Sequence, residues 1–273
     1  MNIGVDLGGT NVRVGLVDGV QILKLVSEPS KSDKSEAEVI DQIISLIERV
    51  LCPEVQHIGI GVPSVVDSKR GVVYNVIGIP SWKEVHLKER LEAYFKIPVS
   101  VDNDCNCFAI GVNHFENTIQ YKNMVCMALG TGVGAGIIID GELYSGGNTG
   151  AGEFGSVAYL DKDYEYYCSS RFFVGRGTTG KQAYECALQG DAQALDLWRE
   201  FGVHVGNLVQ LVLFTFDPNA LVFGGSISSA FDFFKDSMMQ QIQKFPYPKT
   251  VEHLTIYPSK IQNIGVLGAS VEK

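Results

Sequence analysis

The sequence predicts an α/β protein with two domains of similar plan. An apolar run over residues 3–7 breaks at a glycine turn and resumes over residues 12–17, which is the pattern of a β-hairpin. The same order of strand, glycine turn and strand returns over residues 125–139. Helical and extended segments alternate after each hairpin, as they do in α/β domains. A chain of 273 residues is long enough for two such domains.

The composition describes a globular protein with a substantial core. Hydrophobic residues make up 45% of the chain and charged residues 19%. A formal net charge of −9 argues against nucleic acid and anionic membranes as partners. The longest apolar run, residues 208–216, is less than half of the roughly 20 residues that span a bilayer. Asp6 falls where a secretion signal would be apolar, and the six scattered cysteines are expected to be thiols, so the sequence predicts a cytoplasmic protein.

The first glycine turn has the residue types of a phosphate-binding site with a metal beside it. Gly8 and Gly9 allow the backbone to approach a ligand and to turn its N–H groups toward it, and the Thr10 hydroxyl adds a donor. The carboxylate of Asp6 can help to hold Mg²⁺. The alternative is a tight hairpin in which the two glycines serve the turn geometry alone. The matching turn at residues 130–132 favours a phosphate site, because it predicts a second cradle of the same kind.

The periodicity of the remaining segments predicts further helices and strands. In the first domain we expect a helix over residues 35–51 opened by the capping box Ser35-x-x-Glu38, strands over 57–62 and 71–76, a helix over 87–95 and a buried strand over 97–101. In the second domain we expect a glycine-rich loop over 142–154, a helix over 191–216, a strand over 221–223, a helix to about residue 244, a strand over 254–257 and a last helix over 264–273.

The buried strand runs into three polar residues, Asp102-Asn103-Asp104, at the start of the next helix. A carboxylate at a strand end can face a cleft and act as a base toward a hydroxyl in phosphoryl transfer. The alternative is that Asp102 or Asp104 only caps the helix, a role worth about 1 kcal/mol. A cap needs one such residue and the sequence offers three, so Asp104 is the candidate base.

Five motifs occur in the order and approximate spacing of the ROK family (repressors, open reading frames, kinases), and the resemblance covers essentially the whole chain. The motifs are Asp6-Leu-Gly-Gly-Thr10, Asn103-Asp104, Leu129-Gly-Thr-Gly-Val-Gly134, Gly152-Glu153-Phe-Gly155 and Asp217-Pro-Asn-Ala-Leu-Val-Phe-Gly-Gly225. The resemblance implies the two-domain actin-like ATPase (ribonuclease H-like) fold, with nucleotide and sugar in the interdomain cleft. It implies that the last helix packs on the first domain, which gives domains of residues 1–116 plus 263–273 and residues 117–262. It also implies a homodimer.

The same resemblance implies an ATP-dependent kinase for a hexose or N-acetylhexosamine, with the C6 hydroxyl as the expected acceptor. Asn103 and Asp104 inherit contacts to sugar hydroxyls, and Asp104 inherits the role of base. Glu153 is a further sugar-hydroxyl acceptor, and Asp6 is expected to orient Mg²⁺ through water. The nucleotide contacts are expected at Gly8, Gly9, Thr10, Asn11, Thr131, Gly132, Gly224 and Gly225.

The sequence departs from the family where most members bind structural zinc. Ser156 stands in place of their histidine, and Cys168 is the only cysteine between Ser156 and Arg171. One thiol cannot replace the three of the family's zinc knuckle, so we expect no zinc site.

The sugar pocket is altered as well. Ser170 stands where the family has a glutamate that contacts the sugar, and Gly78 stands where many members have an asparagine. We expect Ser64, Gly78 and Ser156 to line a reshaped pocket that fits an N-acetyl or otherwise modified hexose. Glucose is not excluded as a substrate. Some N-acetylmannosamine kinases of the family similarly lack the knuckle.

Two other functions are compatible with parts of the sequence. A sugar-sensing protein without catalysis would account for the altered pocket, but it would not need the intact Asp6, Asp104 and Gly-Thr-Gly motif. An actin-like polymer subunit would share the glycine turns, but it would not account for Asn103-Asp104 together with Glu153. The first predicted strand starts next to Met1, so we expect no helix-turn-helix ahead of it, which disfavours a transcriptional regulator.

Overall fold

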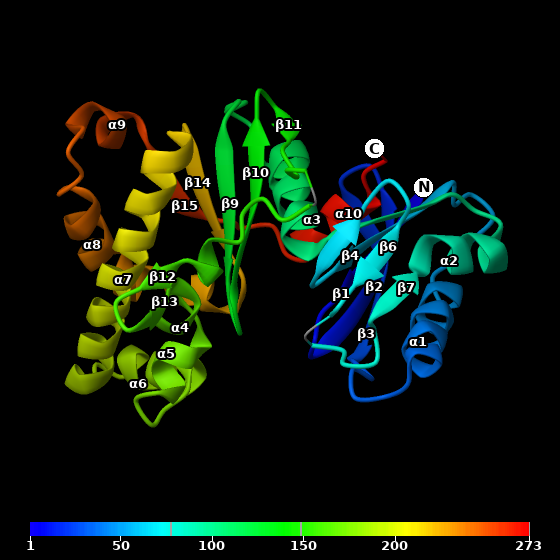
Figure 1. Cartoon of the computed structure of the whole chain (residues 1–273), viewed down its shortest axis with the longest axis horizontal. Helices are drawn as coiled ribbons and strands as arrows, with labels where there is room; N and C mark the ends of the chain where they lie inside the picture. Colours follow the sequence, from blue (N-terminus) through cyan, green and yellow to red (C-terminus); the bar gives the residue numbers. More distant parts are fainter. Residues whose placement is uncertain (77, 148, 273) are drawn as a thin grey trace. The chain divides into compact units, whose positions relative to one another are not determined.

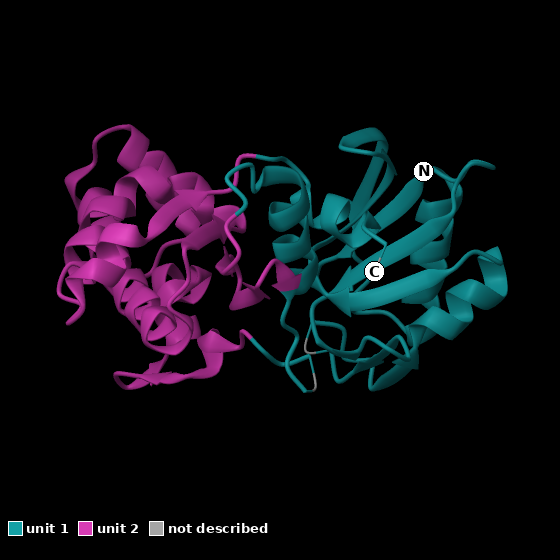
Figure 2. Ribbon diagram, turned by 90° about the horizontal axis from the view of Figure 1, so that it is seen from above, with its two compact units in different colours: residues 1–120, 143–151, 261–273 teal, residues 121–142, 152–260 magenta. Residues whose placement is uncertain are grey.

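The computed structural model describes residues 1–76, 78–147 and 149–272. The chain divides into two compact units, shown in teal and magenta in Figure 2. The first unit comprises Met1–Gln120, Leu143–Ala151 and Ile261–Lys273, and the second comprises Tyr121–Glu142 and Gly152–Lys260. The segment 143–151, which lies inside the second domain expected from the sequence, thus clusters with the first unit.

The first unit is built on two sheets (Figure 1). Its strands are β1 (Asn2–Leu7), β2 (Asn11–Asp18), β3 (Gln21–Pro29), β4 (His57–Val62), β5 (Val65–Asp67), β6 (Val72–Tyr74), β7 (Glu84–His86) and β8 (Val99–Asn103). Its helices are α1 (Glu36–Glu48), α2 (Leu87–Phe95), α3 (Asp104–Gly111), the short π-helix η1 (Val112–Glu116) and α10 (Ile264–Ser270). The main sheet has the order β3-β2-β1-β4-β8, with β1 to β3 antiparallel and β4 and β8 parallel to β1, and β5, β6 and β7 form a small antiparallel sheet.

The alternation of side chains along β1 explains how helices cover both faces of the main sheet. Ile3, Val5 and Leu7 point to one face and are completely buried in a core that they share with the apolar side of α1. Gly4 points to the other face, where a Cβ atom would lie 1.9 Å from the carbonyl oxygen of Val266 in α10. The last helix therefore packs directly on the sheet of the first unit, as Figure 1 also shows.

The second unit repeats this plan. Its strands are β9 (Met124–Leu129), β10 (Val133–Ile139), β11 (Glu142–Leu143), β12 (Ala158–Tyr159), β13 (Lys162–Asp163), β14 (Ala220–Gly224) and β15 (Thr255–Pro258). Its helices are η2 (Phe154–Ser156), α4 (Tyr164–Cys168), α5 (Ser170–Val174), α6 (Gly180–Leu188), α7 (Ala192–Phe216), η3 (Ser226–Ala230), α8 (Phe231–Ile242) and α9 (Pro248–His253). The sheet order is β11-β10-β9-β14-β15, with β9 and β10 antiparallel and with β14 and β15 continuing in parallel, so both units have a hairpin followed by parallel strands.

The long helix α7 forms the core of the second unit together with α8. It spans 25 residues and is capped by Asp217, which has a left-handed φ of 42° and precedes a proline. Gly202 lies so close to α8 that a Cβ atom would be 2.1 Å from the Oγ atom of Ser237. The prediction that residues 191–216 form a core helix is confirmed.

The expected elements differ from the observed ones in a few places. Helix α1 ends at Glu48 instead of residue 51, and helices α4, α5, α6 and α9 are not predicted. Two of the missed helices carry clear start signals: Thr179 and Gln182 form a capping box ahead of α6, and a proline opens α9. Within the described ranges, no helix has the length and hydropathy needed to cross a bilayer.

Candidate functional site

The turn between β1 and β2 is an open stretch of backbone. The N–H of Gly8 donates to the carbonyl oxygen of Asn11 at 2.9 Å, which closes the turn, and Gly9 and Thr10 are exposed. A Cβ atom on Gly9 would meet no atom within 4 Å. The protein's own packing therefore does not require a glycine at this position, which is consistent with a ligand that approaches the backbone.

Asp6 lies beside this turn and forms an ion pair with Arg13, which is not among the expected site residues. The hairpin register places Arg13 directly opposite Asp6, and the Nη1 atom of Arg13 lies 3.1 Å from Oδ2 of Asp6. Burial raises the pKa of Asp6, and the guanidinium of Arg13 opposes that shift. Alignment of the two apolar runs across the turn would have predicted this pair, because Leu7 then faces Val12.

The motif Asp102-Asn103-Asp104 lies at the same edge of the main sheet as Asp6. Asp6 is in register with Gly61 of β4, and Gly61 is in register with Asp102 of β8. Strands β1, β4 and β8 run in parallel, so their carboxyl ends lie together. This is the edge at which open α/β sheets bind ligands.

The structure gives each residue of Asp102-Asn103-Asp104 a different environment. Asp102 is 3% exposed, and its Oδ1 atom accepts hydrogen bonds from the Asn103 N–H and from Nδ2 of Asn106. Asn103 is the N-cap of α3, and its side-chain oxygen accepts from the N–H groups of Cys105 and Asn106. Asp104 is half-buried and begins the helix. The cap is thus neither of the two aspartates considered in the sequence analysis, and Asp104 is the acid of the motif that is not deeply buried.

Two further expected sugar residues lie in the first unit next to these groups. The Nδ2 atom of Asn103 donates to the carbonyl oxygen of Ser64 at 3.3 Å. A Cβ atom on Gly78 would lie 3.8 Å from the Cα atom of Gly9, so Gly78 lies against the first glycine turn. The buried side chain of Trp82 anchors the segment that carries Gly78, and its neighbour Ile77 lies outside the described residues.

In the second unit, two glycine turns meet at the carboxyl ends of β9 and β14. The first turn is closed by a hydrogen bond of 3.0 Å from the Gly130 N–H to the Gly132 carbonyl oxygen, and it exposes Thr131. Gly224 ends β14, and Gly225 follows it with a φ of 80°. A Cβ atom on Gly225 would lie 2.2 Å from the carbonyl oxygen of Leu129, so only glycine fits this close approach.

The motif around Glu153 owes its two glycines to packing against β10. A Cβ atom on Gly152 would lie 2.0 Å from the Ala135 carbonyl oxygen, and one on Gly155 would lie 2.6 Å from the Val133 carbonyl oxygen. The glycines therefore hold Glu153 next to the strand that leaves the Gly130–Gly132 turn. Glu153 is exposed as a residue, but the protein around its carboxyl group displaces part of the water there and raises its pKa, and the negative charge of Glu165 raises it further.

Glu165 and Arg171 are a second charged pair that sequence reasoning missed. The Oε1 atom of Glu165 lies 2.9 Å from Nη2 of Arg171, and a Cβ atom on Gly132 would lie 2.6 Å from Oε2 of Glu165. The Ser170 N–H donates to the Gly130 carbonyl oxygen at 2.8 Å. Both charges are thus held at the second glycine turn by tertiary packing, which leaves no signal in the sequence.

An aromatic cluster of Tyr159, Tyr164, Tyr167 and His204 lies where the family resemblance places the zinc knuckle. The rings of Tyr159 and Tyr164 stack with centroids 4.2 Å apart, and the Tyr159 hydroxyl lies 3.2 Å from Nδ1 of His204. Burial raises the pKa of the neighbouring Cys168 thiol. Among the described residues, no three His, Cys, Asp or Glu side chains are grouped to hold a metal ion. Ser156 is exposed at the end of η2.

Comparison with known proteins agrees with the motifs. The model of the ROK family matches residues 2–271. A glucokinase of Streptomyces coelicolor is 30% identical over 281 residues, which cover 90% of this chain and 88% of that protein. A xylose repressor of Bacillus spizizenii is 24% identical over 98% of this chain and 76% of that protein. The family model and these likenesses extend over nearly the whole chain.

Solved structures give the same result for the fold. The crystal structure of a ROK family glucokinase from Streptomyces griseus, in complex with glucose and AMPPNP, superimposes with a TM-score of 0.85 at 27% sequence identity. The match covers 98% of this chain and 97% of that chain. The chain therefore belongs to the ROK family and has the actin-like ATPase fold of its sugar kinases.

Proposed function

We propose that the chain is an ATP-dependent sugar kinase, which transfers the γ-phosphoryl group of ATP to the C6 hydroxyl of a hexose or N-acetylhexosamine. The observation that carries this proposal is the division of roles at the end of β8. Asp102 is buried and Asn103 caps α3, whereas Asp104 is half-buried at the sheet edge that it shares with Asp6. This is where a base for a sugar hydroxyl would have to lie if the Gly8-Gly9 turn holds the transferred phosphoryl group.

In the proposed reaction, Asp104 accepts the proton of the sugar hydroxyl as that oxygen attacks the γ-phosphorus. The new bond joins the hydroxyl oxygen to phosphorus. The bond from phosphorus to the β,γ-bridging oxygen breaks, and ADP leaves with its electron pair. Phosphoryl transfer of this kind requires mainly positioning and electrostatic stabilisation from the protein.

The glycine turns supply the groups that phosphate requires. Gly8, Gly9 and Thr10 offer exposed backbone and a hydroxyl donor in the first unit. Mg²⁺, when bound, would neutralise charge on the phosphate oxygens, and Asp6 would hold it through water. The positive charge of Arg13, 3.1 Å from Asp6, favours the ionised carboxylate and opposes the effect of burial. The other nucleotide contacts are proposed at Asn11, Thr131, Gly132, Gly224 and Gly225.

The sugar contacts are proposed at Asn103, Asp104 and Glu153, with the small residues Ser64, Gly78 and Ser156 lining the pocket. The oxygen of the Asn103 side chain accepts two backbone hydrogen bonds, so its NH₂ group is the part suited to a sugar hydroxyl. One N–H of that group reaches Ser64, and an amide has two. Small residues enlarge the space around the sugar, which is consistent with a modified hexose.

The substitution Asp104→Asn tests the assignment of the base. We expect kcat to fall by about 10²–10⁴-fold, because the amide cannot accept the hydroxyl proton. The dissociation constant of the sugar, measured by calorimetry without nucleotide, should change far less than kcat. The exposed Asp18 at the end of β2 provides a matched control, since Asp18→Asn removes the same charge from the same unit. Full turnover in Asp104→Asn would overturn the assignment.

The alternative function is a ROK protein that senses a sugar without phosphorylating it. The altered sugar pocket favours it, and so does the likeness to a repressor. A sensor would bind sugars and gain thermal stability from them without releasing ADP from ATP. The two functions are therefore separated by measuring both properties with the same sugars.

A further inference from the structure

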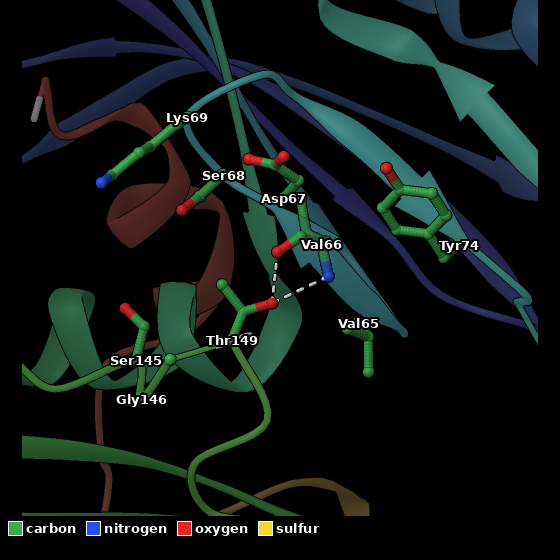
Figure 3. A pocket seen from close by; sticks show the side chains of 10 residues that line it. Val65, Val66, Asp67, Ser68, Lys69, Tyr74, Ser145, Gly146 and Thr149 are labelled. Atoms are coloured by element: carbon green, nitrogen blue, oxygen red, sulfur yellow. Dashed lines mark hydrogen bonds between the residues drawn. The ribbon is translucent and has the colours of Figure 1, made fainter.

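A pocket of about 740 Å³ lies within the first unit next to the proposed sugar residues (Figure 3). One wall is β5 with the turn that follows it, and the opposite wall is formed by Ser145, Gly146, Gly147 and Thr149. Ser64 connects this pocket to Asn103: its carbonyl oxygen accepts from Asn103, and its hydroxyl donates to the carbonyl oxygen of Tyr74 at 2.5 Å. Val65 follows Ser64 in the sequence, Tyr74 accepts the hydrogen bond of the Ser64 hydroxyl, and both Val65 and Tyr74 line the pocket.

The loop wall is fixed to β5. The Oγ1 atom of Thr149 accepts from the Val66 N–H at 2.9 Å and donates to the Val66 carbonyl oxygen, and Figure 3 draws both bonds. Thr149 has a left-handed φ of 53°, which a threonine adopts only when its surroundings impose it. These contacts explain why the segment 143–151 belongs to the first unit, and they give the pocket two defined walls.

The lining is polar and suited to hydroxyl groups. Tyr74 and Ser145 contribute hydroxyls, and Tyr74 also offers a ring face on which a sugar ring can pack. The Asp67 carboxylate accepts a hydrogen bond from the Arg70 N–H at 3.0 Å, and its other lone pairs can accept from ligand hydroxyl groups. Within the described part of the chain, Lys69 forms no ion pair with an acid, so its ammonium group can donate to a ligand. Neutral polyhydroxylated ligands match this mixture of donors and acceptors.

The volume discriminates between possible substituents of the sugar. At about 30 Å³ for each water-sized group, an acetamido group needs roughly 120 Å³, whereas an additional hexosyl unit needs roughly 330 Å³. The observed 740 Å³ is far larger than an acetamido group requires, and it falls within the range of about 300–1,000 Å³ that is typical of small-molecule sites.

We propose that this pocket, which we call the 65–149 pocket, binds the second sugar ring of a disaccharide or glycoside whose other ring is phosphorylated. The inference rests on the proposed function for the identity of the first ring. It extends that function, because it makes a glycoside the preferred substrate over the free hexose. The walls then act as specificity determinants and take no part in the transfer.

The test compares glucose with the disaccharides cellobiose and maltose. In the wild-type protein, kcat/KM for at least one disaccharide should exceed that for glucose by about tenfold or more. Ser145→Trp fills the pocket and should abolish that advantage while kcat/KM for glucose stays within about twofold. Gly147→Phe provides a second variant, since a Cβ atom at Gly147 meets no atom within 4 Å. Tyr144→Trp is the matched control, because Tyr144 is exposed on the same loop and does not line the pocket.

The outcomes separate the inference from the proposed function. Equal losses for glucose and disaccharides in Ser145→Trp and Gly147→Phe, or phosphorylation of glucose alone by the wild-type protein, would overturn the inference and leave the kinase assignment intact. If no sugar is phosphorylated, the kinase assignment fails and thermal shifts decide about the pocket. A stabilisation by disaccharides that exceeds that by glucose, and that disappears in both pocket variants, would support the pocket, and its absence would refute it.

Discussion

At the scale of single residues, two carboxylates of the candidate site, Asp6 and Glu153, lie where their negative charge is disfavoured. Burial raises the pKa of Asp6, and both burial and the charge of Glu165 raise the pKa of Glu153. Such shifts gather at functional sites, because groups that bind or move protons are placed close to one another and away from water. Arg13 forms an ion pair with Asp6 directly. Arg171 forms an ion pair with Glu165, the residue whose charge acts on Glu153.

The first prediction concerns the pH dependence of sugar binding. Glu153 accepts a hydrogen bond from a sugar hydroxyl best when it is ionised, so binding should weaken as the pH falls through its raised pKa. Glu165→Gln removes one cause of that shift, lowers the pKa of Glu153 and should move the loss of binding to lower pH. Calorimetric titrations of sugar between about pH 4 and pH 8 measure the effect.

Arg171→Gln is the control for this prediction because it should act in the opposite direction. Loss of the guanidinium leaves the charge of Glu165 uncompensated, which raises the pKa of Glu153 further. Profiles that move in the same direction in both variants, or that do not move in either, would show that Glu153 does not govern the binding.

At the scale of elements, the position of α10 depends on glycines at its contacts with β1, β4 and α3. A Cβ atom on Gly268 would lie 1.8 Å from the Cys107 carbonyl oxygen and 2.6 Å from the Gly111 nitrogen. On the same helix, a Cβ atom on Gly265 would meet only the Asp6 carboxyl group, at 3.9 Å. The same helix thus contains one glycine, Gly268, with no room for a side chain and another, Gly265, with room for a methyl group.

The second prediction compares these two glycines. Gly268→Ala should lower the free energy of unfolding by about 1–3 kcal/mol, because the backbone of α3 must move. Gly265→Ala should leave it unchanged or raise it by up to roughly 1 kcal/mol, since alanine favours a helix. Urea unfolding followed by circular dichroism measures both variants. Equal stability of the two proteins would contradict the close packing of α10 on α3.

The aromatic cluster of the second unit lies in the segment that carries Ser156, which the sequence predicts to bind no zinc. Tyr159 accepts a hydrogen bond from Nδ2 of Asn207 at 2.9 Å and contacts His204 as well as stacking on Tyr164. Aromatic pairs of this kind contribute about 0.5–1.5 kcal/mol beyond the area that they bury. We infer that packing and hydrogen bonds replace metal coordination in this segment.

The third prediction follows from that replacement. Prolonged treatment with a metal chelator should leave the melting temperature of the protein unchanged, because the segment depends on side-chain packing. Tyr159→Phe should lower the free energy of unfolding by about 1 kcal/mol through its lost hydrogen bonds. Tyr247→Phe, at a position 63% exposed in the same unit, should have no effect. A melting temperature that falls with the chelator would indicate a structural metal and refute the replacement.

At the scale of the whole molecule, the repeated plan of the two sheets is the feature that the sequence predicts best. Each hairpin contains a glycine turn between two apolar runs, so the hairpin itself follows from a local pattern. The sequence places the Asp102-Asn103-Asp104 motif correctly between a strand and a helix, but it does not show which of the three residues caps the helix. The cap is Asn103, and its position depends on φ and ψ at the strand end. The assignments of individual site residues to substrates stay predictions.

The pair Arg13–Asp6 follows from the register of the first hairpin, so aligning its two apolar runs would have predicted it. Other features depend on tertiary packing and leave no local pattern, as the pair Arg171–Glu165 shows. The segment 143–151 has the sequence of a glycine-rich loop of the second domain, and the hydrogen bonds between Thr149 and Val66 tie it to the first unit. The homodimer implied by the family resemblance also stays a prediction.

The measurement that tests the central claim most directly is ADP release by the wild-type protein with ATP, Mg²⁺ and a panel of hexoses, N-acetylhexosamines and their glycosides. The kinase assignment predicts that ADP appears only when an accepted sugar is present, and that sugar phosphate forms in equal amount with the phosphate on the C6 oxygen. ADP release that is independent of sugar, or its absence with every sugar that raises the melting temperature, would contradict the assignment.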